Sequence, residues 1–270
     1  MKTQTTKELE HVLWTGLKEL RMPGIRNSFQ DAAQLARQES LSFERFLLSL
    51  VEREQQARTH NRIQRGLRSS GLPLEKTLEM FDRTRLPLKI NHQFSTLLEG
   101  GFLDRRENVL AVGPPGSGKT HLLCALGHAL VFQGRRVRFY GCSTLVEELV
   151  QSKREQRLSQ FMKQLLRYEA LIVDGLGYMQ HSRQEMDLFF HVLAERYERG
   201  SLLITSHLAF SQWEKIFQDP TVTTAAVDRF VHHSVILELN LPSSALLIEK
   251  RPDNESSSVY VGEHFRVSAW

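Results

Sequence analysis

An octapeptide between an apolar segment and a helix-forming segment constrains the fold of this chain more than any other feature. Residues 113–120 read Gly-Pro-Pro-Gly-Ser-Gly-Lys-Thr and fit the pattern G-x-x-x-x-G-K-[ST]. Glycines let such a loop wrap so that successive backbone N–H groups point at phosphate oxygens, and the following helix adds the positive end of its dipole. The pattern therefore predicts a phosphate-binding loop (P-loop); the alternative is a glycine-rich turn that binds no ligand.

The chemistry of the P-loop assigns a role to most of its residues. Lys119 is expected to reach the β- and γ-phosphates of ATP, and Thr120 is expected to offer its hydroxyl to Mg²⁺. ATP and Mg²⁺ are thus the expected cofactors. The predicted nucleotide contacts are Gly113, Pro114, Pro115, Gly116, Ser117, Gly118, Lys119, Thr120 and His121.

A second nucleotide element is predicted at residues 170–174, Ala-Leu-Ile-Val-Asp. An aspartate at the carboxyl end of a buried parallel strand occupies the position of a Walker B acid, which aligns Mg²⁺ through water. Strands often end in aspartate, so the alternative is that Asp174 caps a turn. Because a further strand lies between Lys119 and Asp174, we expect Asp174 to be a catalytic residue and, with Thr120, a metal-site residue.

Apolar segments alternate with helix-forming segments from residue 108 onward. Strands are expected at 108–112, 136–140, 170–174, 201–205 and 235–239, and helices at 121–131, 143–167 and 183–199. Strands separated by helices imply a parallel sheet covered on both faces. The predicted fold class is therefore α/β: a P-loop parallel sheet flanked by helices, preceded by a small helical domain.

Helical periodicity dominates the first 70 residues and sets the expected domain boundaries. The pair Pro23-Gly24 is expected to end a first helix, with further helices near 28–40 and 42–71. Trp14 and Phe29 are expected in the core of this part. The predicted division is a helical domain over 1–70, a linker leading into the core over 71–107, the ATPase domain over 108–242, and a divergent, weakly ordered tail over 243–270.

Basic residues are concentrated ahead of the P-loop. The formal net charge of the chain is +4, and residues 53–89 hold nine Lys or Arg against four Asp or Glu. Arg58, Arg62, Arg65 and Arg68 have helical spacing and form one stripe, which could track a DNA phosphate backbone; the alternative is a solvated helix face. No aromatic residue interleaves the stripe, so duplex DNA is favoured over a single strand, without sequence specificity.

Membrane and disulfide classes are disfavoured by the sequence. No apolar run approaches the ~20 residues that would span a bilayer, and the first residues are polar and charged where a signal peptide would need an apolar stretch. Cys124 and Cys142 cannot form a disulfide framework and lack metal-ligand spacing. A cytoplasmic location without membrane contact is expected.

Four segments resemble a known family. NVLAVGPPGSGKTHL, LIVDGLGY, ERYERGSLLITS and DRFVHHSVILEL resemble the IstB/DnaC-like branch of AAA+ ATPases, and within it the IstB helper ATPases of insertion sequences. The resemblance covers roughly residues 5–243. It implies an AAA+ module behind a small helical domain, with ATP, duplex DNA, a transposase and further copies of the chain as partners.

The resemblance also implies a role for Arg229 and exposes three departures. Arg229, in Asp-Arg-Phe, matches the arginine finger that a neighbouring subunit inserts toward the γ-phosphate, so it would act only in an oligomer; the alternative is an ion pair with Asp228 or another acid. Gly175, His207 and Ala245 stand where the family has an acid, an asparagine and an arginine around that phosphate. These departures predict impaired hydrolysis, although His207 can still donate a hydrogen bond.

The sequence therefore predicts an ATP-binding helper protein of DNA transposition, with ATP hydrolysis in doubt. One alternative is a loader of a replicative helicase, acting in DNA replication with the same ATPase core. Another is a DNA-binding assembly module in which ATP is a ligand without turnover. A small-molecule kinase is disfavoured because the chain shows neither an acceptor-pocket pattern nor a lid arginine pair.

Overall fold

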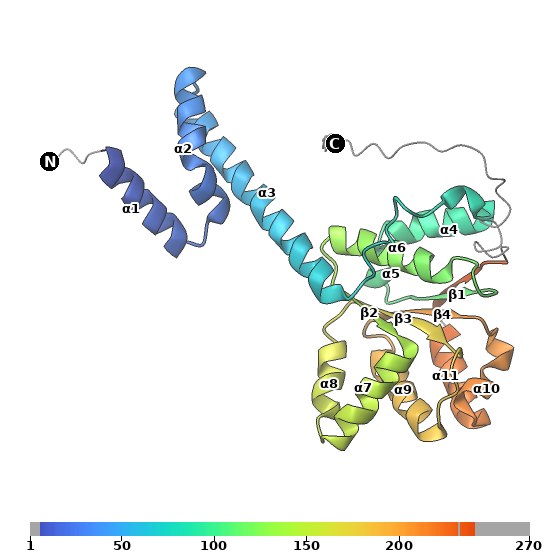
Figure 1. Ribbon diagram of the computed structural model, residues 1–270. Helices are drawn as coiled ribbons and strands as arrows, with labels where there is room; N and C mark the ends of the chain where they lie inside the picture. Colours follow the sequence, from blue (N-terminus) through green and yellow to red (C-terminus); the bar gives the residue numbers. More distant parts are fainter. Residues whose placement is uncertain (1–5, 232, 241–270) are drawn as a thin grey trace, which may run out of the picture.

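The computed structural model describes residues 6–231 and 233–240, which form a helical arm and an α/β core (Figure 1). Three helices build the arm: α1 (Thr6–Glu19), α2 (Pro23–Gln38) and α3 (Phe43–Ser70). Figure 1 shows the arm projecting from the core, with the long helix α3 leading into it. The amino-terminal part is therefore helical, as its periodicity predicts.

One helix boundary in the arm differs from its prediction. The pair Pro23-Gly24 begins α2, whereas the sequence analysis placed the start of this helix near residue 28. Proline is favoured in the first helical turn because its missing N–H would lack an intrahelical partner there anyway. The same proline thus separates α1 from α2 and starts the second helix directly.

The interior of the arm is small. Phe29 is buried with Ala32 and Leu50, as predicted for Phe29. Trp14 is not a core residue: 44% of it is exposed, and the cations of Lys18 and Arg26 lie 5.5 and 5.2 Å from its ring centroid. The expectation for Trp14 was wrong because this apolar position on α1 is partly open to solvent, and no described element of the arm covers it fully.

Five parallel strands form the sheet of the core. They are β1 (Asn108–Val112), β2 (Val137–Gly141), β3 (Ala170–Leu176), β4 (Ser201–Ser206) and β5 (Ser234–Glu238). Their order is β2-β3-β4-β1-β5, and each neighbouring pair is parallel. The predicted parallel sheet is confirmed, and all carboxyl ends of the strands meet at one edge.

Helices cover both faces of this sheet. The core helices are α4 (Leu88–Leu98), α5 (Gly101–Asp104), α6 (Lys119–Phe132), α7 (Cys142–Arg154), α8 (Leu158–Leu165), α9 (Arg183–Arg196), α10 (Glu214–Phe217) and α11 (Pro220–Val231), with short 3₁₀ turns at Arg83–Arg85 and Phe210–Gln212. In Figure 1, α4, α5 and α6 lie on one face and α7 to α11 on the other. Alternate residues of β1 separate the two layers, since Val109 and Ala111 pack with α6 and Leu110 packs on the opposite side.

The segment 71–107 holds two of these helices and contributes to the core. Phe94 of α4 and Phe102 of α5 are 0% and 1% exposed and pack in the same apolar cluster as α6. The Pro and Gly residues at its start predict a linker leading into the core, because they interrupt the helical period. The divergent tail 243–270 lies outside the described residues. None of the described helices is long and apolar enough to cross a membrane.

Candidate nucleotide-binding site

The P-loop lies between the end of β1 and the start of α6, at the carboxyl edge of the sheet. Lys119, the first residue of α6, is 4% exposed, and its Nζ donates to the carbonyl oxygens of Gly113 at 2.8 Å and Pro114 at 2.7 Å. Burial lowers the pKa of the Lys119 ammonium, and the nearby Asp174 carboxylate partly counteracts this shift. The loop therefore wraps around its lysine, with the amino end of α6 behind it.

A carboxylate and two hydroxyls from three elements meet beside Lys119. The Thr120 hydroxyl donates to Asp174 Oδ1 at 2.7 Å, and the Thr205 hydroxyl donates to the same oxygen at 2.6 Å. Thr205 Oγ1 in turn accepts from the backbone N–H of Gly175 at 2.8 Å. The structure thus brings together the two predicted metal-site residues, because α6 begins and β3 ends at the same edge of the sheet.

This oxygen set suits a magnesium ion. Mg²⁺ prefers carboxylate and hydroxyl oxygens together with water and substrate phosphates. Thr120 and Asp174 supply such oxygens next to the loop, so the residues present fit the metal.

Thr205 is a site residue that sequence reasoning missed. The sequence predicted its strand and considered His207 beyond it, but gave the threonine no role. The available signal was its position at the carboxyl end of a strand predicted to lie in the same sheet as Asp174. Thr205 is 1% exposed, so its hydroxyl is free of competition from bulk water.

A cavity of about 220 Å³ opens directly beside the loop. It is lined by Met80, Phe81, Asp82, Arg85, Leu86, Ser117, Gly118 and His121. His121, a predicted nucleotide contact, places Nε2 3.0 Å from the Thr77 carbonyl oxygen, and its ring packs edge-on against Phe81 at 5.1 Å. The mixed aromatic and polar lining has the character of a small-molecule pocket, and most of it comes from the segment that the sequence analysis described as a linker.

The three departures from the family pattern have different structural settings. Gly175 has φ +86° and lies at an irregularity of β3 between Val173 and Leu176, so the strand pairing is interrupted where an acid was expected. The His207 ring lies 4.5 Å from the Tyr178 ring, and its Nδ1 is buried without a hydrogen-bond partner among the described residues. Ala245 lies outside the described residues.

Glu185, the first acidic residue after Asp174 along the chain, caps a helix. Its carboxylate accepts from the backbone N–H of Ser182 at 2.7 Å, and Ser182 Oγ accepts from the Glu185 N–H, which completes a capping box at the start of α9. The hydrogen bond from the Ser182 backbone is the main cause that lowers the pKa of Glu185. Glu185 therefore stabilises the end of a helix.

Arg229 lies on α11, away from the P-loop of its own chain. It lines a cavity of about 290 Å³ together with Asn108, the first residue of β1, whereas the P-loop follows the last residue of that strand. Its guanidinium carbon lies 5.1 Å from the Phe190 ring centroid, and Nη1 is buried without a hydrogen-bond partner among the described residues. Within the described part of the chain, Arg229 has no carboxylate at ion-pair distance, so a pair with Asp228 does not account for it.

The four arginines of the α3 stripe differ in their contacts. Arg58 Nε lies 2.7 Å from Glu54 Oε1, and Arg58 Nη2 donates to the Arg21 carbonyl at 3.3 Å, so this arginine holds the arm together. Arg62, Arg65 and Arg68 are exposed. The four residues do not form one equivalent surface.

Neither Cys124 nor Cys142 is suited to reactive thiol chemistry. Cys124 and Cys142 are free and buried, and burial raises the pKa of each thiol to about 12. The described residues contain no group of three or more His, Cys, Asp or Glu that could hold a metal ion. Both cysteines are packing residues.

The sheet order, the loop between β1 and α6 and the acid at the end of β3 together define a P-loop nucleotide-binding protein of the AAA+ fold. A family model described as IstB-like ATP binding protein matches residues 15–250. The chain belongs to this family.

Relatives named as ATP-binding proteins of insertion sequences share much of the chain. One from Sinorhizobium fredii is 38% identical over 228 residues, covering 84% of this chain and 76% of the relative. Another, from the IS21 insertion sequence of Pseudomonas aeruginosa, is 35% identical over 265 residues and covers 94% of this chain and 99% of the relative.

Two solved structures illustrate the similarity of the fold. The crystal structure of the DnaC helicase loader has a TM-score of 0.54 at 17% identity, covering 62% of this chain and 98% of that one. The AMPPCP-bound DnaA of Aquifex aeolicus has a TM-score of 0.52 at 17% identity, covering 64% and 52%. At these identities the likeness concerns the fold of the core.

Proposed function

We propose that this chain binds Mg·ATP at the P-loop and acts on duplex DNA as the helper of a transposase, with slow ATP hydrolysis. The observation that carries the nucleotide site is the contact between Thr120 Oγ1 and Asp174 Oδ1 at 2.7 Å beside the buried Lys119. Lys119 would hold the β- and γ-phosphates, and Thr120 and Asp174 would hold the ion. The bound Mg²⁺ would supply charge neutralisation on the phosphates.

In this proposal, the pocket beside the loop holds the base of the nucleotide. Phe81 and His121 offer ring surfaces that can pack against a purine, and Asp82 and Arg85 offer polar groups at its rim. These contacts would select a nucleotide over inorganic pyrophosphate, which the loop alone would also accept.

The DNA and transposase parts of the proposal rest on charge and on the relatives. Exposed arginines of α3 supply a surface that a phosphate backbone would neutralise. The names of the relatives place them in insertion sequences, whose mobility needs a transposase. A pull-down with the chain as bait is expected to recover a transposase; recovery of a replicative helicase in its place would favour the loader alternative.

We expect slow hydrolysis because the described residues near Asp174 offer no free acid to orient the attacking water. An acid after the Walker B aspartate usually orients that water, and Gly175 has no side chain. Glu185 is held in a capping box, and the His207 ring packs on Tyr178. Loss of preorganised groups of this kind commonly costs on the order of a hundredfold in rate, so ATP would act mainly as an assembly ligand.

Steady-state phosphate release, with and without duplex DNA, tests the hydrolysis proposal. The parent is expected to bind ATP yet release phosphate well below about 1 per second, the low end of typical enzyme turnover. Because Gly175 has φ +86°, a long side chain there would be strained, whereas Asp and Asn tolerate such backbone best. Gly175→Asp is therefore expected to release phosphate faster than the matched Gly175→Asn.

Two results would contradict slow hydrolysis. Release by the parent with DNA at about 1 per second or faster would show that another residue orients the water. Equal rates for Gly175→Asp and Gly175→Asn, with ATP affinity retained in both, would show that a carboxylate after Asp174 is not the missing group.

A further inference from the structure

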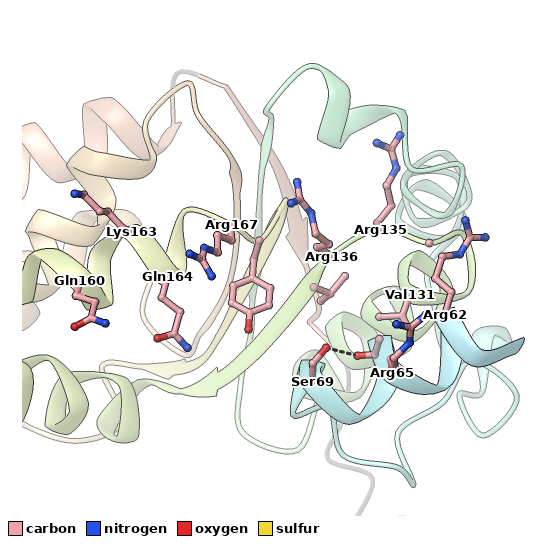
Figure 2. A pocket seen from close by; sticks show the side chains of 14 residues that line it. Arg62, Arg65, Ser69, Val131, Arg135, Arg136, Gln160, Lys163, Gln164 and Arg167 are labelled. Carbon is pink, nitrogen blue, oxygen red and sulfur yellow. Dashed lines mark hydrogen bonds between the residues drawn. The ribbon is translucent and has the colours of Figure 1, made fainter. Parts of the chain in front are cut away.

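A basic groove lies between the arm and the core, and none of the residues that line it belongs to the nucleotide site (Figure 2). It encloses about 750 Å³. Its lining residues with cationic side chains are Arg62, Arg65, Arg135, Arg136, Lys163 and Arg167. No carboxylate is among the described residues that line it, so the hollow is electropositive.

Two helix faces form opposite walls of this groove. The wall from α3 consists of Arg62, Arg65, Gly66 and Ser69, and the wall from α8 and the turn after it consists of Gln160, Lys163, Gln164 and Arg167. Both sets have the spacing i, i+3, i+4, i+7, which places side chains on one face of a helix. The end of α6 and the start of β2 close the floor with Val131, Gly134 and Val137.

Four of the six cations lack an acidic partner. Arg135 lies 2.7 Å from Asp104 and 3.0 Å from Glu169, and Arg136 lies 3.6 Å from the same Glu169, so these two are largely neutralised. No carboxylate lies at ion-pair distance from the other four in the part of the chain that the structure describes. Those four are Arg62, Arg65, Lys163 and Arg167, all exposed.

Close packing fixes the α3 wall to the core. A Cβ added at Gly66 would lie 2.9 Å from Val131 Cγ1, so the backbone of α3 approaches α6 more closely than a side chain at this position would allow. The α3 wall of the groove is therefore held against the core by packing. Uncompensated like charges held together in a hollow create a potential that attracts a polyanion.

We propose that this groove binds the phosphodiester backbone of duplex DNA, with Arg62 and Arg65 on one wall and Lys163 and Arg167 on the other contacting phosphates. The inference rests on the proposed function and moves the DNA contact from the whole Arg58–Arg68 stripe to a two-walled site. Hydroxyl and amide side chains among the cations suit phosphate oxygens. Tyr168 is the single aromatic side chain among the described residues of the lining, and one ring cannot stack successive bases, so a duplex is favoured over a single strand.

The test is a salt series of fluorescence anisotropy with the full chain and a labelled mixed-sequence duplex. Lys163→Ala/Arg167→Ala is expected to weaken binding about tenfold and to flatten the log–log salt slope by about 2, since each phosphate contact contributes about 0.9. Arg62→Ala/Arg65→Ala is expected to show the same loss of affinity and the same change in slope. Lys163→Arg/Arg167→Lys keeps both charges and is expected to keep the parent slope.

A matched control removes two exposed charges elsewhere. Arg37→Ala/Arg45→Ala lies on the arm outside the groove and is expected to bind DNA as the parent does. ATP binding, measured for every variant, shows that each one is folded.

The outcomes of this test distinguish failure of the groove proposal from failure of the proposed function. If the parent binds duplex DNA and Lys163→Ala/Arg167→Ala keeps its affinity and slope, the groove is the wrong site and the proposed function stands. If the parent binds no duplex DNA at low salt, both the groove proposal and the DNA part of the proposed function are wrong. Loss of poly-glutamate binding by the same variant, with duplex binding retained, assigns the groove to an acidic protein surface and overturns the proposal.

Discussion

Asp174 Oδ1 accepts two hydroxyl hydrogen bonds, from Thr120 and Thr205, and the carboxylate is thereby held in one orientation before any ion arrives. Preorganisation of this kind reduces the ordering cost of binding a metal–nucleotide complex. The N–H of Gly175 donates to Thr205 Oγ1 and so extends this network. Gly175, which stands where an acid was expected, therefore helps to hold Asp174 in place.

Replacing Thr205 tests this network at the scale of one hydroxyl. Thr205→Val keeps the shape but removes a donor to Asp174 and the acceptor of the Gly175 N–H, which should cost about 1–3 kcal/mol in the free energy of unfolding. We expect Mg·ATP affinity to fall about fivefold to tenfold by calorimetry, with Thr205→Ser close to the parent. Equal affinity of Thr205→Val and the parent would mean that Asp174 needs no second hydroxyl.

At the scale of elements, the strands of the core were predictable and parts of the helical framework were not. A buried apolar run ending in a polar residue identifies β3 and β4 because both faces of the sheet are covered. The helices α4 and α5 were not predicted, because Phe94 and Phe102 make them part of the core only through contacts distant in sequence. For the same reason the pocket at Phe81 could not be derived from the chain alone, whereas the P-loop could, since its chemistry is local.

The arm depends on a close approach of two helices at Gly24. A Cβ at Gly24 would lie 2.7 Å from the Cα of Glu54 and 2.8 Å from the carbonyl oxygen of Arg53 on α3, so Gly24→Ala must push α2 away from α3. We expect this variant to lose about 1–3 kcal/mol of arm stability, seen as faster amide hydrogen exchange in α2.

Gly16 of α1 provides the matched control for Gly24. A Cβ there would have no atom within 4 Å, and alanine is favoured over glycine inside a helix by about 1 kcal/mol. Gly16→Ala should therefore slow exchange in its helix. If Gly24→Ala also slows exchange, the tight α2–α3 contact does not hold the arm together.

At the scale of the whole molecule, Arg229 and the P-loop face opposite edges of one sheet. Arg229 lies near the first residue of β1 and the loop follows the last, so the arginine cannot reach its own nucleotide. The Arg229 guanidinium lines a cavity and has no acid beside it in the described structure, so we propose that it serves the nucleotide of a second subunit. The sequence supplied the candidate through the family resemblance; its position relative to the sheet needed the fold.

Sedimentation velocity with and without Mg·ATP tests this role of Arg229. Arg229→Ala is expected to bind ATP as the parent does when dilute, because the residue is remote from its own P-loop, yet to lose ATP-dependent assembly. Arg199→Ala, which removes an exposed arginine just after α9, is expected to assemble normally. Parent-like assembly of Arg229→Ala would exclude the arginine from the subunit interface.

The central claim is that the P-loop with Lys119 binds Mg·ATP, and titration calorimetry of Lys119→Ala tests it most directly. The Lys119 ammonium is buried within the loop, so its loss should weaken Mg·ATP binding at least tenfold, about 1.4 kcal/mol. Lys153→Ala, at the exposed end of α7, removes the same charge away from the loop and should bind as the parent does. Parent-like affinity of a folded Lys119→Ala would contradict the account.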